Sequence, residues 1–361
     1  MKSRLLIFGL IVFSSCYFNE EEIPDTAPWK YGSPSSVDLN ESTLFELDEN
    51  LRQGGFDQIR GVVAIKDDKL IFENYYEGGD RETDQFLSGA TMSVMSMLTG
   101  IALDRGFLDS IQTPISVFFP DYPAAFNFEP LKGEITVEHL LLMKSGFAWY
   151  ETGVPVLNPN NSLNGLTASN DWIEHALTRD MDAVPGLRYS YNSTHGVLLA
   201  KILERASGQP FVDFVNEVLF APMSIGSASW QADAFGNVNG GFGLSLNLID
   251  FAKLGDLYLN NGVWKGQRLV SEEWVTTSTS QQFQIDRFSN FAYSWQLFSE
   301  LSTFSGILPE NDTYFAEGAG GQYLFVVPHQ NFVLAVTADN FFENGFTPLI
   351  IFRDFFAEAF Q

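Results

Sequence analysis

The sequence has few of the residues that build disulfide, metal and nucleotide sites. Its single cysteine, Cys16, excludes an intramolecular disulfide. A glycine-rich stretch at 240–243 is not followed by the lysine of a phosphate-binding loop. The histidines show no spacing typical of metal ligands; they are His139, His175, His195 and His329. We therefore predict no metal and no cofactor.

Basic residues are also scarce. The chain has 20 Lys and Arg against 45 Asp and Glu, so its formal net charge is −25. Nucleic acids and anionic lipids would be repelled by such a chain, and we exclude nucleic acid as a partner. Apolar residues make up 45% of the chain and 34 residues are Phe, which is typical of a packed globular protein. The length of 361 residues allows one large or two ordinary domains.

The N-terminus has the pattern of an export signal. Two basic residues precede the apolar run 5–13, which is too short to span a bilayer. The following Ser14-Ser15-Cys16 resembles the lipobox of bacterial lipoproteins, although Phe13 stands where an aliphatic residue is usual. This resemblance implies that residues 1–15 are removed and that Cys16 carries a lipid anchor. Plain secretion with cleavage near Ser15 is the alternative.

The segment after the signal is acidic and rich in Pro and Ser, and we predict that residues 16–45 form a tether from the membrane. The folded domain is expected over residues 46–361. The lipobox resemblance implies a location in the bacterial cell envelope, anchored to the membrane and facing the periplasm or the cell surface.

The rest of the chain reads as an α/β protein. A β-hairpin is predicted over 62–76, with its turn at Asp67-Asp68, and a helix before it over 43–53. Further strands are predicted over 291–298, 322–327 and 332–337, and a closing amphipathic helix over 346–360. Between these ends the pattern is mainly helical, with helices expected over 136–143, 171–178 and 194–206, and a further helix after a glycine-rich approach within 240–261.

Two further expectations concern this arrangement. We predict that the loop 148–170, which is rich in Pro and Asn, covers a cleft. The whole pattern predicts an antiparallel sheet flanked by helices, with an inserted all-α subdomain.

The most informative stretch is FLSGATMSVMSMLTGIALDRGFL at 86–108. From Thr91 onward it has the apolar pattern of a buried helix, and Ser88 stands where an N-cap is expected. Its tail resembles the segment after the nucleophile in penicillin-binding proteins and class C β-lactamases. The segments at 135–147, 184–211, 241–275 and 317–339 also resemble that family, within it the branch of the 6-aminohexanoate-dimer hydrolases and esterases. The resemblance implies the β-lactamase/transpeptidase-like fold.

The family's first motif, Ser-x-x-Lys, is missing. By the resemblance the nucleophilic serine falls at position 89 and the lysine at 92, where this chain has Gly89 and Met92. None of its lysines follows a serine by three residues, so the motif is not displaced elsewhere. A lysine without its serine would be a buried, poorly paired charge, and Met92 has similar length without charge. Losing the nucleophile costs a serine hydrolase roughly 10⁶-fold in rate, so we predict that acylation is absent or severely impaired.

The second and third motifs are retained in part. Tyr191 occupies the position of the tyrosine that relays the proton, and Ser193 replaces its companion asparagine near the substrate amide. The third motif reads Ala319-Gly320-Gly321, without its cation, on the strand expected to edge the cleft. The backbone N–H of Gln322, with that of residue 89, is expected to form the oxyanion hole.

Other serines near the motif are weaker candidates. Ser88 could act as the nucleophile only if the helix began one residue earlier, which would rotate it by about 100° away from Tyr191. Ser93 and Ser96 point away from the site and are expected to pack the helix.

Three functions remain open at this point. The favoured one is a β-lactamase-related protein that cannot be acylated and binds a small molecule or peptide, such as a peptidoglycan fragment or an amide or ester. The second is an active hydrolase of small amides, esters or β-lactams with an unorthodox nucleophile. The third is a structural surface lipoprotein without a ligand.

Overall fold

The structure is a computed structural model, and it describes residues 28–56, 58–155, 157–304, 307–308, 312–341 and 346–360. The predicted signal peptide and the predicted lipidation site Cys16 lie outside these residues. Within the described part of the chain, no helix has the length and apolar character needed to cross a membrane.

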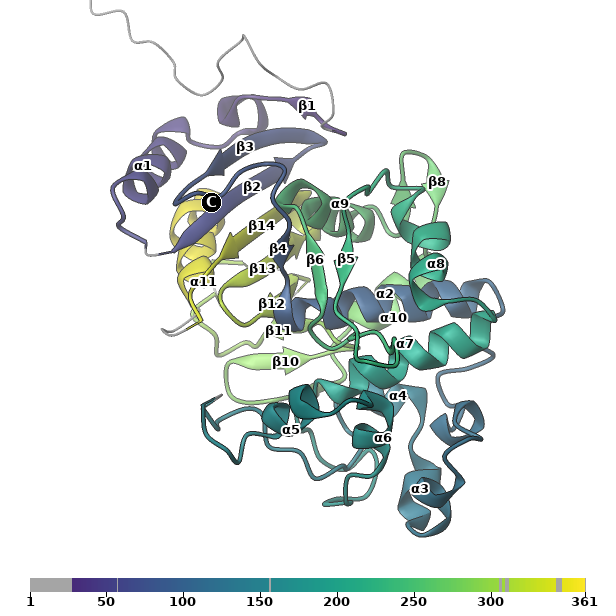
Figure 1. Ribbon diagram of the computed structural model, residues 1–361. Helices are drawn as coiled ribbons and strands as arrows, with labels where there is room; N and C mark the ends of the chain where they lie inside the picture. The colour runs from purple at the N-terminus through teal and green to yellow at the C-terminus, as the bar shows by residue number, and fades with distance from the viewer. Residues whose placement is uncertain are drawn as a thin grey trace, which may run out of the picture.

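A mixed sheet forms the centre of the molecule (Figure 1). In the described residues it has nine strands in the order β1-β3-β2-β14-β13-β12-β11-β10-β9, and every neighbouring pair is antiparallel except β1 and β3. The strands are β1 Lys30–Tyr31, β2 Ile59–Lys66, β3 Lys69–Tyr75, β9 Phe283–Gln284, β10 Ser289–Phe291, β11 Gln296–Phe298, β12 Tyr314–Gly318, β13 Gln322–Val327 and β14 Phe332–Ala338. The sheet therefore joins strands from both ends of the chain.

Helices cover both faces of this sheet. On one face lie α1 (Glu41–Arg52) and the C-terminal helix, which begins as α11 (Thr347–Ile351) and continues as a π-helical turn to Ala357. On the other face lie α9 (Leu248–Leu259) and α2 (Thr91–Asp104). Each face has its own buried apolar cluster, because strand side chains alternate between the two faces. The predicted α/β architecture is confirmed.

The middle of the chain forms the helical subdomain that the sequence predicted. Its helices are α3 Pro123–Asn127, α4 Val137–Leu141, α5 Ser162–Ala168, α6 Trp172–Leu177, α7 Thr194–Ser207 and α8 Phe211–Val215. Gly208 ends α7 in the left-handed conformation, as expected for a C-cap glycine. The predicted loop 148–170 is interrupted by α5, whose N-cap is the side chain of Asn161. The remaining helix, α10, spans Glu272–Thr279.

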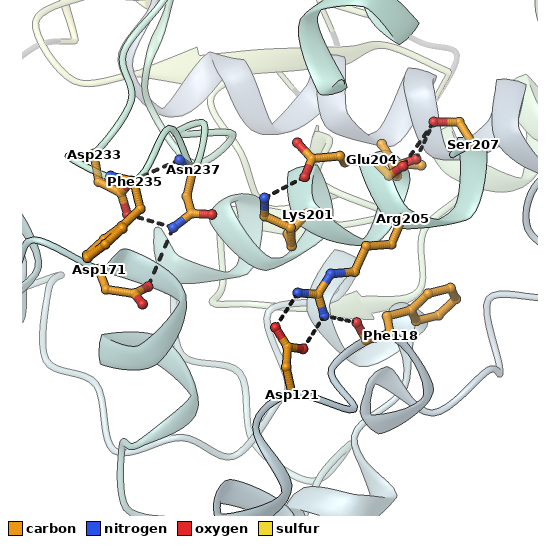
Figure 2. A network of polar contacts seen from close by, with 11 residues as sticks. Phe118, Asp121, Asp171, Lys201, Glu204, Arg205, Ser207, Asp233, Phe235 and Asn237 are labelled. Atoms are coloured by element: carbon orange, nitrogen blue, oxygen red, sulfur yellow. Dashed lines mark hydrogen bonds and ion pairs between the residues drawn. The ribbon is translucent and has the colours of Figure 1, made fainter. Parts of the chain in front are cut away.

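Polar contacts hold this subdomain together (Figure 2). Asp171 caps α6, and Asn237 reaches both Asp171 and Asp233. Asp233 also accepts the backbone N–H of Trp172 at 2.8 Å, so the loop around it is tied to the start of α6. Arg205 of α7 donates two bonds of 2.7 Å to Asp121. The donors and acceptors in this network therefore join elements of the fold to one another.

Two small sheets complete the fold. One contains β4 Gln85–Phe86, β5 Ser229–Trp230 and β6 Leu244–Leu246, and the other is the hairpin of β7 Val263–Trp264 and β8 Gln267–Arg268.

Three local predictions were wrong. Residues 28–45, predicted as tether, belong to the folded body: Trp29 is 7% exposed, and β1 pairs with β3. The predicted strand 291–298 is the hairpin β10–β11, because Ser294 adopts a left-handed φ of 61° at the turn. Ser88 does not cap α2; it lies in a 3₁₀ turn, Ser88–Ala90, with no side-chain cap. In the first case buried apolar side chains outweigh the polar composition of the segment, and in the other two the conformation of a turn decides the local structure.

Candidate active site

The turn before α2 carries the first site position. The 3₁₀ turn Ser88–Ala90 leads directly into α2, and Ser88 has a left-handed φ of 50°. Residues Thr91–Ala102 of α2 are all buried, so the helix is fixed in the core and holds the turn in place. Met92, one turn after Gly89, is 2% exposed and lies among these core residues. The turn and the first turn of α2 therefore hold Gly89 and Met92 at fixed positions in the core.

Strand β12 passes directly against this turn. A Cβ atom on Gly318 would lie 2.1 Å from the carbonyl oxygen of Leu87, so only glycine fits there. The carbonyl oxygen of Glu317 lies 3.1 Å from the place of a Cβ on Gly89. The strand that edges the cleft therefore ends in Ala316-Glu317-Gly318, which the sequence reasoning did not identify as a strand.

The predicted third motif lies three residues further on and has a different role. Gly320 and Gly321 have φ of 87° and 93° and, with Ala319, form the turn from β12 to β13. Gln322 begins β13, and its side-chain amide donates to the carbonyl of Ala338 at 2.5 Å. None of these four residues belongs to the wall of the cavity described below, and their substrate-binding role stays a prediction.

Tyr191 approaches the vacant nucleophile position. Its hydroxyl oxygen lies 2.7 Å from the place that a Cβ on Gly89 would occupy. That distance is shorter than van der Waals contact, so the tyrosine occupies space that a serine side chain would need. Ser193, expected to face substrate, is buried instead: its hydroxyl donates to Glu151 Oε1 at 2.6 Å and its N–H to Oε2 at 2.9 Å.

A cavity of about 20 Å³ remains between these elements. Its walls are Gly89, Met92, Ser93, Met143, Tyr191, Phe291, Ser294, Gln296, Phe315 and Glu317. One water needs about 10–15 Å³, whereas small-molecule sites usually measure about 300–1,000 Å³. The structure therefore leaves room for about one water where the family would place the reacting bond.

Two buried acids, Glu317 and Glu151, lie at or near this cavity. Glu317 accepts Gln296 Nε2 at 2.5 Å and the hydroxyl of Tyr323 at 2.8 Å, and burial raises the pKa of its carboxyl. Burial also raises the pKa of Glu151, against its bonds from Ser193 and Trp149. Among the described residues no lysine, arginine or histidine lines the cavity. The site therefore has no positive charge to activate a nucleophile.

The surroundings of Tyr191 disfavour its ionised form. Its pKa is raised well above its ordinary value, first by burial and then by the nearby Glu151 carboxylate. A tyrosinate would need a neighbouring cation to form near neutral pH. The hydroxyl is therefore a neutral donor or acceptor here.

Three further serines lie in different places relative to the cavity. Ser88 is absent from the cavity wall, and Ser93 donates its hydroxyl to the carbonyl of Ser294 at 2.7 Å. Ser145 lies 2.7 Å from Nε2 of His195, but both residues are buried and neither lines the cavity. Burial lowers the pKa of His195 to about 3, and the pair joins the end of α4 to α7.

The comparison with known proteins agrees with this fold. The sequence profile of the Beta-lactamase family matches residues 47–349. The chain belongs to the beta-lactamase family. Among curated beta-lactamase relatives, the 6-aminohexanoate-dimer hydrolase of Paenarthrobacter ureafaciens is 23% identical over 253 residues. That match covers 66% of this chain and 61% of the relative, less than two thirds of the relative's length.

Solved structures of beta-lactamase relatives share the architecture. A Bacillus anthracis protein provisionally assigned as a 6-aminohexanoate-dimer hydrolase superposes with a TM-score of 0.73 at 17% identity, covering 91% of this chain and 87% of its own. A penicillin binding protein from Bacillus halodurans superposes with a TM-score of 0.67 at 15% identity, covering 87% of this chain and 100% of its own. At such low identity these likenesses show the fold alone.

Within the beta-lactamase fold, the structure brings Gly89, Met92 and Tyr191 together around one cavity. It adds Glu317 and Glu151, which the sequence reasoning missed. Glu317 could have been noticed as the one acid in the apolar run of β12, next to a glycine. Glu151 lies in a loop far from Ser193 in sequence, and no local pattern marks it. No group of three or more His, Cys, Asp or Glu side chains in the described residues is arranged to hold a metal.

Proposed function

We propose that this protein is an acylation-deficient member of the beta-lactamase family that acts in the cell envelope by binding and not by turnover. The observation that carries the proposal is the Gly89–Tyr191 contact. The tyrosine hydroxyl lies 2.7 Å from the place of a Cβ at the nucleophile position, and the lysine position holds Met92.

Electrostatics supports the same reading. Acyl transfer by this family's route needs a base that accepts the serine proton and donors that stabilise the oxyanion. Here burial raises the pKa of the Tyr191 hydroxyl, and the nearby Glu151 and Glu317 raise it further. Two features therefore act against catalysis. Glycine at position 89 removes the nucleophile, and the acidic surroundings of Tyr191 disfavour negative charge in the transition state.

The size of the cavity limits what can bind. A peptide, amide or ester group is too large for about 20 Å³. Such a ligand would enter only if the segment carrying Glu151 moved away from Ser193, which would break the two hydrogen bonds between these residues. We therefore propose that cleft binding of an envelope peptide is coupled to opening of this segment, and that the lipid anchor on Cys16 keeps the protein at the membrane.

Intact-mass spectrometry of the full-length protein tests the proposal. The protein is incubated with a penicillin and, separately, with an activated ester, beside the double variant Gly89→Ser/Met92→Lys. We expect no adduct on the unmodified protein. The matched control, Gly89→Ser/Met92→Leu, has the serine without its lysine and should stay unlabelled.

Each outcome is informative. An adduct on the double variant alone supports both the motif register and the loss of activity. An adduct on the unmodified protein overturns the proposal, and peptide mapping then identifies the nucleophile, including Ser88. If the double variant is also unlabelled, the Tyr191 contact has closed the site beyond two substitutions, which a third change, Tyr191→Phe, would test.

A further inference from the structure

A second and much larger cavity lies away from the candidate active site. It measures about 620 Å³, within the usual range of small-molecule sites. β1, the turn between β2 and β3, the end of α9 and the β7–β8 hairpin surround it. Figure 1 shows these elements at the top of the molecule, above β10 and α4. No residue in its wall also lines the cavity at Gly89.

A buried carboxyl group lies in the wall of this cavity. Asp256 of α9 is 6% exposed and accepts the indole N–H of Trp29 at 3.1 Å and the amide of Asn260 at 3.1 Å. Both donors are neutral, and within the described residues Asp256 makes no ion pair. Burial raises the pKa of this carboxyl to about 6, so near neutral pH it is a charge without a counter-ion.

Two tryptophans stand beside the carboxyl. The rings of Trp29 and Trp264 meet edge to face, with centroids 6.1 Å apart. Lys265 Nζ lies 5.7 Å from the centroid of Trp264, so this indole already contacts one cation. An aromatic ring next to a carboxylate is the combination by which proteins recognise organic cations.

Other charged side chains also face the cavity. Lys30, Lys69 and Lys265 face it together with Asp67 and Asp68. Lys69 is engaged, since its Nζ donates to the carbonyl of Ser36 at 3.0 Å. These groups are on the N-terminal strand, the β2–β3 turn and the β7–β8 hairpin, whereas Asp256 is on α9. In the described residues none of these lysines forms an ion pair with Asp256, and the charged group that acts on its carboxyl besides burial is Asp68, which raises its pKa further.

We propose that this cavity binds a small organic ammonium ion, with its charged group on Asp256 and its apolar part against Trp29 and Trp264. The inference is independent of the proposed function, because it uses none of the residues around Gly89. A buried carboxylate with only neutral donors gains a counter-ion when such a ligand binds, and a primary alkylammonium is the simplest ligand that supplies both the charge and an apolar chain.

Titration calorimetry on the full-length protein tests the ligand class. The probes are n-butylammonium, the neutral n-butanol and the anionic butyrate, which share their chain length. Only n-butylammonium should bind. Because Asp256 must be ionised, its affinity should rise about tenfold between pH 5 and pH 7.5, which follows from a pKa of about 6.

Proton release supplies a test on the unmodified protein. Binding of the cation at pH 6 should release a fraction of a proton from Asp256, seen as a dependence of the binding heat on the buffer. Binding without proton release, equal binding of n-butanol, or no binding of any probe would each overturn the proposal.

Variants assign the effect to one carboxyl. Asp256→Asn should weaken n-butylammonium at least about tenfold and remove the pH dependence. The matched control is Asp68→Asn on the rim of the same cavity, which should change affinity by less than about threefold. If Asp256→Asn does not fold, the proton-release result on the unmodified protein still decides. Equal losses from both substitutions would show a diffuse charge effect and refute a site at Asp256.

Discussion

The contact between Gly89 and Tyr191 can be tested by adding a single methyl group. In Gly89→Ala the new Cβ would lie 2.7 Å from the tyrosine hydroxyl and 3.1 Å from the Glu317 carbonyl oxygen. Overpacking of this kind costs about 1–3 kcal/mol. Gly89 does not have a left-handed φ, so the backbone of an alanine is not strained there. Alanine also stabilises the protein by about 0.4–1 kcal/mol, because it lowers the conformational entropy of the unfolded chain. We expect a net loss of about 1–2 kcal/mol in the free energy of unfolding.

The partner variant isolates the cause. In Tyr191→Phe the hydroxyl is gone, and the nearest remaining tyrosine atom, Cζ, is 3.6 Å from the new Cβ, an ordinary contact. Gly89→Ala should therefore be nearly neutral in that background. Urea denaturation of the four proteins gives the coupling energy, which we expect at about 1–2 kcal/mol.

A matched glycine shows what the substitution does without the contact. Gly226 has an ordinary φ and no atom within 4 Å of its would-be Cβ, so Gly226→Ala should be neutral or slightly stabilising. If Gly89→Ala and Tyr191→Phe are additive within about 0.5 kcal/mol, the hydroxyl does not fill the nucleophile position, and the physical basis of the proposed function is wrong.

Three further outcomes follow from the structure. Burial of Asp256 penalises its ionisation in the folded state. Between pH 4 and its raised pKa of about 6, the free energy of unfolding should therefore fall as pH rises, by about 3 kcal/mol relative to Asp256→Asn. Equal pH slopes in the two proteins would contradict this; the opposite pH effect of His195, whose pKa is lowered, is the same in both proteins. Asp233→Ala leaves four donors without their acceptor and should cost about 2–4 kcal/mol, and Asp233→Asn less, as measured by thermal unfolding; unchanged melting temperatures would contradict the network of Figure 2. Gly318→Ala places a Cβ 2.1 Å from the Leu87 carbonyl and should cost more than about 3 kcal/mol, whereas Gly133→Ala, in open space, should change little; a loss below about 1 kcal/mol would show that β12 can shift away from the turn.

Most of the fold could be predicted from the sequence because the patterns that determine it are local. The β2–β3 hairpin follows from two β-rich runs around Asp67-Asp68, both of which adopt the left-handed conformation of a tight hairpin turn. α7 follows from an apolar face ended by Gly208. The positions Gly89, Met92 and Tyr191 follow from spacing within segments that resemble one family, and these three residues surround one cavity.

The rest of the site depends on contacts between distant parts of the chain. Glu151 meets Ser193 across 42 residues, and neither sequence neighbourhood marks the pair. The third motif was misplaced because a glycine pair is equally suited to a strand edge and to a tight turn, and here Gly320 and Gly321 form the turn. Gly318 is fixed by its approach to Leu87, a contact that no sequence pattern records.

The two-residue strand β1 protects one edge of the main sheet. By pairing with β3, Lys30–Tyr31 covers part of an edge that would otherwise present free N–H and C=O groups to another copy of the chain. A fragment that began at residue 46, where sequence composition alone puts the start of the domain, would remove this strand together with the buried side chains of Trp29, Val37, Leu39 and Leu44. Its bare sheet edge and exposed apolar face would favour edge-to-edge aggregation, so a soluble fragment of this protein should begin no later than residue 28.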